Sequence, residues 1–274
     1  MLEWLGRTVA ERGIAYADID AAAAEALVDE ALELIVPQFL GGILLGGGRY
    51  DYLLARNRRA LIGVVADTAQ LLAADGYVPV AWEQGFGMGE GSFAALTLEL
   101  PGERRLVLRG VIDRIDVKET EEGSFFRVID YKTGMVKIST RDVYSGRRLQ
   151  LLSYLQVVAE NARFAHAYGK AHYQLLSDDL KKVDSGAAAA PPLKLTGLKD
   201  DVYARVALPQ VLAETATRLL DGEIAAQPLL DGEDHCARCD YRDFCGFDRE
   251  LCSPRLPRRP DDDWDTDEGT EVDE

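Results

Sequence analysis

The stretch Phe126–Gly134 reads FRVIDYKTG and places an acid, a lysine and a turn at the end of an apolar strand. Alternate side chains of a strand share a face, so Asp130 and Lys132 should point the same way, roughly 7 Å apart. Such a pair could be a surface ion pair, which is common and adds little stability. The segments on either side of this stretch make the pattern more specific.

Upstream, Leu106–Val117 reads LVLRGVIDRIDV and predicts a second strand, and the polar loop after it makes the two strands a hairpin. Asp113 and Asp116 are three residues apart, so in a regular strand they face opposite sides. Only one of them can face Asp130. The preceding Gly110 allows a bend or a close approach, which favours Asp113.

Downstream, Arg147–Asn161 reads RRLQLLSYLQVVAEN and predicts a helix. Gln150 and Tyr154 are four residues apart and therefore share one helix face. We expect two acids, a lysine and this Gln/Tyr pair to converge.

Phosphodiester hydrolysis is a reaction that can use two acids, a lysine and a Gln/Tyr pair in one site. Two carboxylates, Asp113 and Asp130, can hold Mg²⁺ or Mn²⁺, which prefer oxygen ligands. A divalent ion lowers the pKa of a bound water and screens charge on the phosphate. Lys132 can position or deprotonate the attacking water, or stabilise the transition state. Gln150 and Tyr154 can hold the nucleic-acid backbone or the lysine.

Four blocks, in order, carry a family resemblance: GVIDRID (110–116), VIDYKTG (128–134), LQLLSYL (149–155) and CARCDYRDFCGFD (236–248). They resemble the PD-(D/E)xK nuclease superfamily in its RecB-type form, and in more detail the C-terminal nuclease domain of AddB subunits of bacterial AddAB helicase–nucleases. The resemblance runs roughly from Leu2 to Phe247. It implies an α/β, restriction-endonuclease-like fold with a mixed central sheet flanked by helices. It also implies catalytic residues Asp113, Asp130, Lys132, Gln150 and Tyr154, with metal ligands Asp113, Asp130 and the backbone carbonyl of Tyr131.

The function implied by the resemblance is that of a cytoplasmic DNA exonuclease in double-strand break repair. It would cut single-stranded DNA produced by unwinding, the strand that ends 5′, beside an AddA-like helicase–nuclease subunit. Two alternatives remain: an inactive nuclease-fold scaffold or DNA-binding module of such a complex, and a free-standing RecB-like exonuclease. Because the chain has no Gly-Lys-Ser/Thr phosphate-binding loop, we expect no ATPase activity of its own.

The spacing Cys236-x2-Cys239-x5-Cys245 is typical of metal ligands. The resemblance implies that these are three of the four ligands of a [4Fe–4S] cluster. The family's fourth cysteine lies far upstream, and this chain has no cysteine before Cys236; Cys252 could substitute. An iron–sulfur cluster, zinc, and reduced unligated thiols therefore stay open.

The family also has a metal-binding histidine near its domain start. All three histidines here, His166, His172 and His235, come after Lys132, so none can be that ligand. The opening MLEWLGR resembles the segment directly after that histidine in relatives. We therefore expect an N-terminally truncated chain, with weak nuclease activity or none in isolation.

The formal net charge of −16 is unusual for a DNA-binding protein, but the charge is unevenly distributed. Residues 260–274 hold nine acids and no Lys or Arg, and without them the charge is −7. Between Arg104 and Arg148 the local charge is +4. Since phosphate binding depends on the local field, DNA binding is compatible with this balance. The basic region is small, so we expect a partner protein to supply much of the affinity for DNA.

The sequence divides into a helical part (1–76), a nuclease core (77–200), a helix with the Cys-rich segment (201–259) and a disordered acidic tail (260–274). The expected helices are Leu2–Glu11, Ala21–Val36 capped by Asp18 or Asp20, Tyr50–Ala74, and Val202–Ile224, with Pro209 as kink or start. Further expected strands are Tyr77–Gln84, Phe93–Leu100 and Ala171–Leu176. Arg56, Arg58 and Arg59 form a solvated face or contact DNA or a partner. Glu83 is a further metal-shell acid or a solvated strand residue. No apolar run of 18 residues exists, so no membrane span is expected.

Overall fold

The computed structural model describes ten segments of the chain, which fall into two compact units. The segments are 1–38, 47–121, 123–132, 140–164, 168–175, 207–223, 225–229, 236–237, 239–248 and 254. The first unit comprises residues 1–95, 109–137 and 157–194, and the second comprises the remainder. Several predicted features lie outside the described residues: the 178–200 loop, His166, His235, Cys252 and the acidic tail.

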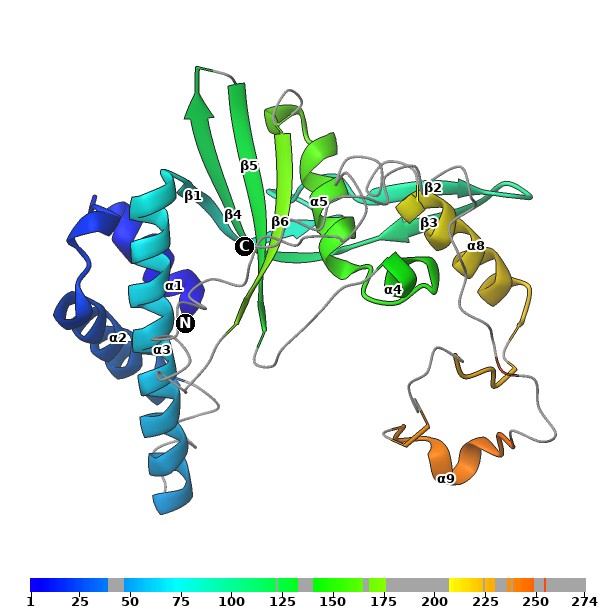
Figure 1. Ribbon diagram of the computed structural model, residues 1–274, viewed down its shortest axis with the longest axis horizontal. Helices are drawn as coiled ribbons and strands as arrows, with labels where there is room; N and C mark the ends of the chain where they lie inside the picture. The colour runs from blue at the N-terminus through cyan, green and yellow to red at the C-terminus, as the bar shows by residue number, and fades with distance from the viewer. Residues whose placement is uncertain are drawn as a thin grey trace, which may run out of the picture. The chain divides into compact units, whose positions relative to one another are not determined.

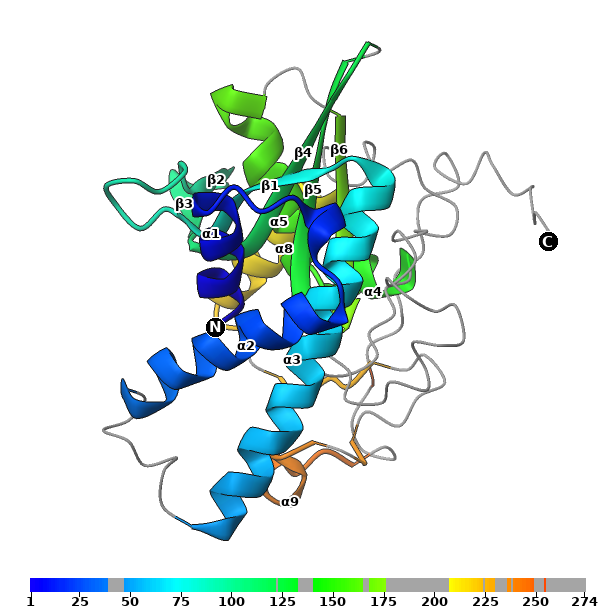
Figure 2. The same cartoon turned by 90° about the vertical axis from the view of Figure 1, so that its left-hand side faces the viewer.

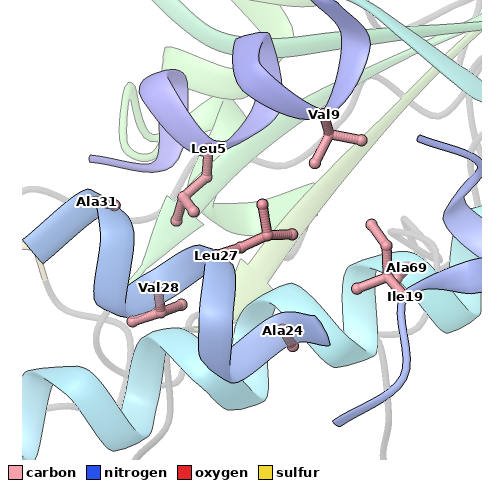
Figure 3. Close-up of a cluster of buried hydrophobic side chains, with 8 residues drawn as sticks. All are labelled: Leu5, Val9, Ile19, Ala24, Leu27, Val28, Ala31 and Ala69. Atoms are coloured by element: carbon pink, nitrogen blue, oxygen red, sulfur yellow. The ribbon is translucent and has the colours of Figure 1, made fainter. Parts of the chain in front are cut away.

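The first unit begins with a small helical bundle: α1 (Leu2–Glu11), the 3-10 turn η1 (Tyr16–Asp18), α2 (Ala21–Ile35) and α3 (Gly48–Asp75). Asp20 caps α2 by accepting the Ala23 N–H at 2.8 Å, as predicted, and Gly76 ends α3 in the left-handed conformation. Figure 3 shows the apolar cluster that joins the helices, formed by Leu5, Val9, Ile19, Ala24, Leu27, Val28, Ala31 and Ala69. Arg58 bonds Asp29 and Glu25 of α2, so this part of the predicted arginine face holds the bundle together.

A four-stranded mixed sheet completes the first unit, in the order β1-β4-β5-β6. Its strands are β1 (Val78–Phe86), β4 (Gly110–Thr120), β5 (Gly123–Lys132) and β6 (Tyr168–Leu175). The first three run antiparallel, and β6 lies parallel to β5 (Figure 1). Figure 2 shows α1, α2 and α3 in front of these strands, on one side of the sheet. This is the α/β architecture that the sequence predicts.

The prediction of a single strand over Leu106–Val117 is wrong, because the structure has two strands there. The strand is interrupted at Arg109: β3 (Arg104–Leu108) pairs with β2 (Leu96–Leu100), whereas β4 joins the main sheet. The glycine expected to permit a bend begins β4. The predicted Phe93–Leu100 strand is also shorter, since Phe93 makes only an isolated bridge to Phe86. The polar loop, expected over Lys118–Ser124, is tighter, because Thr120 already pairs with Gly123.

The second unit contains the β2–β3 hairpin and the helices α4 (Thr140–Tyr144), α8 (Leu208–Leu220) and α9 (Arg242–Cys245). Helix α5 (Gln150–Glu160) crosses from the second unit into the first. Pro209 lies in the first turn of α8, where a missing N–H costs nothing, so it marks the start of the helix rather than a kink. Within the described residues, no helix has the length and apolar character needed to cross a membrane.

The packing of α1 on β1 depends on Gly6. A Cβ atom built at this position would lie 2.0 Å from Nε1 of Trp82 and 2.4 Å from Cε2, well inside contact distance. Because an indole ring cannot bend away, Gly6→Ala should push α1 off the strand and lower the free energy of unfolding by about 1–3 kcal/mol. Urea unfolding measures this loss. Gly48→Ala, where a Cβ meets nothing within 4 Å, is the control, and equal effects of the two changes would contradict the packing.

Candidate active site

Three acidic residues occupy opposite positions on three neighbouring strands of the main sheet. The strand register places Glu83 opposite Asp113, and Asp113 opposite Asp130 just beyond the last paired residues. Directly opposite residues of neighbouring strands share a face of the sheet. The pairings that set this register are Trp82↔Arg114 and Gln84↔Ile112 between β1 and β4, and Arg114↔Ile129 between β4 and β5.

The two aspartates are held by nitrogen donors from β5. Asp113 Oδ2 accepts the backbone N–H of Tyr131 at 2.7 Å. Lys132 Nζ lies 2.5 Å from Asp130 Oδ2, so the lysine and the acid do share a face. The structure therefore brings Asp113, Asp130 and Lys132 together at the end of the β4–β5 pair.

Asp130 is almost completely buried, with 1 % of its surface exposed. Burial raises the pKa of its carboxyl above the ordinary value; Lys132 opposes this rise and the neighbouring Asp113 adds to it. Among the described residues, no donor makes a regular hydrogen bond to Asp130 Oδ2, which has only the ion pair with Lys132. A buried carboxylate oxygen with remaining acceptor capacity suits a cation ligand.

Glu83 adopts a left-handed backbone conformation, with φ of 47°, which is uncommon for a residue other than glycine. Burial raises the pKa of its carboxyl, and the charge of Asp113 raises it further. Strained residues of this kind gather at functional sites. Of the two interpretations of Glu83, these observations favour a place beside the other two acids.

The acids fit a hard divalent cation, although no three His, Cys, Asp or Glu side chains within the described segments are gathered closely enough to hold a metal on their own. Asp113 is turned towards the Tyr131 N–H and Asp130 towards Lys132. Mg²⁺ commonly binds through one or two carboxylates and keeps several waters, so a three-residue cage is not required.

Asp116 belongs to the opposite face of the sheet, as its spacing from Asp113 predicts. It is completely buried and accepts hydrogen bonds from two guanidinium groups, Arg114 at 2.8 Å and Arg127 at 2.7 Å. Its oxygens are therefore occupied by the sheet's own cations. Asp116 therefore has a structural role, and of the two aspartates only Asp113 is on the same face as Asp130.

Gln150 and Tyr154 face one another on α5, where Gln150 Nε2 donates to the Tyr154 hydroxyl at 2.8 Å. Both belong to the second unit, whereas the carboxylates belong to the first. Their expected convergence on the acids stays a prediction.

No disulfide joins the described cysteines to one another: Cys236 is half-buried, and Cys239 and Cys245 are exposed. The Cys239 N–H bonds the Cys236 carbonyl in a turn at 3.3 Å, and Cys245 ends α9. In the part of the chain that the structure describes, the three sulfurs do not form a metal-binding group. The iron–sulfur cluster that the resemblance implies, like the zinc and unligated-thiol alternatives, stays a prediction.

Comparison with known proteins decides the family. The model of the PD-(D/E)XK nuclease superfamily matches residues 2–246. The chain belongs to this superfamily. The match covers both units and all three residues that meet at the end of β4 and β5.

Curated members with related sequences are ATP-dependent helicase/deoxyribonuclease subunits B. The chain is 25 % identical to the subunit of Alkaliphilus metalliredigens over 91 % of its length and 26 % of the relative's. Identity is 31 % to the Acetivibrio thermocellus subunit over 59 % of the chain and 14 % of that protein. Identity is 35 % to the Bacillus thuringiensis (strain Al Hakam) subunit, over 54 % of the chain and 13 % of that protein. The chain thus spans about a quarter or less of the length of these relatives.

Sequence reasoning left Glu83 open and gave Tyr131 no side-chain role. Glu83 could not be placed from the sequence alone, because its position opposite Asp113 depends on the pairing of β1 with β4. Tyr131 stands between Asp130 and Lys132, so its ring must enter the opposite face, where Arg114 lies. That face holds polar groups which the apolar pattern of the strands did not predict.

Proposed function

We propose that this chain is the metal-dependent DNA exonuclease domain of an AddAB- or RecBCD-like helicase–nuclease that acts in double-strand break repair. Its substrate is single-stranded DNA produced by unwinding, and its partner is an AddA-like subunit. The observation that carries the proposal is the meeting of Asp113, Asp130 and Lys132 at one end of the sheet. The family match and the named relatives support it.

In this proposal Asp113, Asp130 and the Tyr131 carbonyl hold Mg²⁺ or Mn²⁺. The ion supplies Lewis acidity and offsets the charge that develops on the scissile phosphate. Asp130 fixes the Lys132 ammonium beside the reacting phosphate, where it orients the attacking water and stabilises the developing negative charge. Glu83 adds a third carboxylate that can hold a water. Gln150 and Tyr154 hold the DNA backbone or the lysine.

Cleavage of an end-labelled single-stranded oligonucleotide in Mn²⁺, with enzyme in excess over DNA, tests the function. We expect Asp113→Asn and Lys132→Gln each to lower the cleavage rate by about 100-fold or more, because each removes a group that acts on the transition-state charge. Enzyme excess allows slow cleavage by this chain to be measured.

Glu99→Gln is the matched control, because Glu99 is an exposed carboxylate on β2 in the other unit. This variant should cut at the wild-type rate. Cleavage that survives Asp113→Asn, or a wild-type chain that binds no Mn²⁺ and cuts nothing, would contradict the proposal and favour an inactive scaffold.

A further inference from the structure

Tyr131 joins the two faces of the sheet at the candidate site. Its backbone N–H donates at 2.7 Å to Oδ2 of Asp113, whose side chain is on one face. On the other face its hydroxyl accepts a hydrogen bond from Arg114 at 2.8 Å, with the guanidinium carbon 5.6 Å from the centre of its ring. A single residue therefore touches the acid and is itself held by a buried cation.

Arg114 is held in turn by Asp116. Its Nε and Nη2 donate to the two carboxylate oxygens at 2.8 and 3.1 Å, which is the bidentate geometry that a planar guanidinium favours. The side chains are 2 % and 0 % exposed. Since neither charge can reach water, the pair is confined to this geometry, and it fixes the direction in which Arg114 presents its remaining nitrogen to Tyr131.

Asp116 also accepts a hydrogen bond from a second arginine, which in turn contacts the helical bundle. Arg127 donates to Asp116 Oδ2 at 2.7 Å and also bonds Asp75, the last residue of α3. The ring of Tyr77 lies 4.3 Å from the Arg127 guanidinium carbon. A continuous series of contacts therefore runs from α3 through Arg127, Asp116, Arg114 and Tyr131 to Asp113.

From this series we propose that Arg114 and Tyr131 are positioning residues, which orient the Asp113 carboxylate for the divalent ion. The inference rests on the proposed function, because it assigns a role at the same site. The Tyr131 hydrogen bond fixes one oxygen of Asp113 and leaves the other for the ion. Without the Arg114 contact, the end of β5 that carries the donor is less constrained, and the acid loses its fixed orientation.

Tyr131→Phe is the mildest test, since it removes one hydroxyl and keeps the ring. Groups that orient a metal-binding side chain typically contribute about 10- to 100-fold to metal affinity. We expect Tyr131→Phe to weaken Mn²⁺ binding about 10-fold, measured by calorimetric titration of the purified chain. Arg114→Lys should act in the same direction, because an ammonium keeps the charge but cannot bond Asp116 and Tyr131 in one plane.

Tyr77→Phe is the matched control. Tyr77 contacts Arg127, at the opposite end of this series of contacts from Asp113. If the network served folding alone, Tyr131→Phe would lower the unfolding temperature, and neither Tyr→Phe variant would change Mn²⁺ affinity. The inference predicts a change in affinity for Tyr131→Phe only, in protein whose unfolding temperature shows that it is folded.

Asp113→Asn separates failure of the inference from failure of the proposed function. Loss of Mn²⁺ binding in Asp113→Asn, with unchanged affinity in Tyr131→Phe and Arg114→Lys, overturns the positioning role and leaves the nuclease assignment intact. Unchanged Mn²⁺ binding in Asp113→Asn overturns both. Weaker binding in the Asp113, Tyr131 and Arg114 variants, with Tyr77→Phe like the wild type, supports both.

Discussion

Replacing Asp130 by asparagine is expected to abolish DNA cleavage and, in the same protein, to raise the free energy of unfolding at pH 7 without metal. Asparagine keeps the shape of the side chain but removes the charge that we propose holds the ion, and with it the ionic partner of Lys132. A loss of several kcal/mol in transition-state stabilisation lowers the rate about 1,000-fold or more. The stability gain results from the burial of Asp130, which makes its ionised form costly.

The raised pKa of Asp130 determines whether Asp130→Asn increases or decreases the free energy of unfolding at a given pH. Burial and the nearby Asp113 charge hold the pKa of Asp130 above its ordinary value of 3.8, despite Lys132. The folded state therefore binds this proton more tightly than the unfolded chain does, and wild-type stability falls as pH rises from 3.8 through the raised folded pKa. The Asp130→Asn variant has no such titration, so the stability difference should vanish at low pH and be largest at neutral pH.

Urea unfolding of both proteins in EDTA, at several pH values, measures this difference. A variant that is less stable than the wild type at neutral pH would mean that the Lys132 ion pair outweighs the burial of the charge. In that case the lysine would hold Asp130 for stability rather than for chemistry.

Asp116→Asn should cause the largest loss of stability among single changes in the first unit. Asp116 neutralises two buried guanidinium groups, and an amide would remove the carboxylate that Arg114 and Arg127 share. Breaking a buried ion pair by removing one partner costs about 3–5 kcal/mol, because the remaining charge is left uncompensated. Urea unfolding at pH 7 measures the loss.

Glu30→Gln is the comparison for Asp116→Asn. Glu30 pairs with Arg12 at 2.5 Å, but both side chains are nearly half exposed. An exposed pair contributes about 1 kcal/mol or less. Similar losses in the two variants would show that water reaches Asp116 and that the arginine network is not a buried support of the sheet.

The first three helices and the strand positions of Asp113, Asp130 and Lys132 could be predicted because their signals are local. Asp20 caps α2 through its own side chain, and Gly76 ends α3 through its own backbone. The alternation of a strand alone places Asp130 and Lys132 on one face. It also separates Asp113 from Asp116, so these predictions needed no knowledge of the partner strands.

The features that could not be predicted depend on partners distant in sequence. The run Leu106–Val117 has apolar residues at strand-like positions on both sides of Arg109. The interruption at Arg109 exists because the two halves pair with different strands. The buried link from Asp75 to Tyr131 joins α3, β4 and β5, and neither arginine is recognisable as buried from composition. The relation of Gln150 and Tyr154 to the acids depends on the packing of the two units.

A crystal of the chain soaked in Mn²⁺ and measured for anomalous scattering tests the central claim most directly. The account predicts an anomalous peak coordinated by carboxylate oxygens of both Asp113 and Asp130, with Lys132 beside it, and no such peak in Asp113→Asn crystals. A peak elsewhere alone, or two aspartates that bind no ion at saturating Mn²⁺, would contradict it.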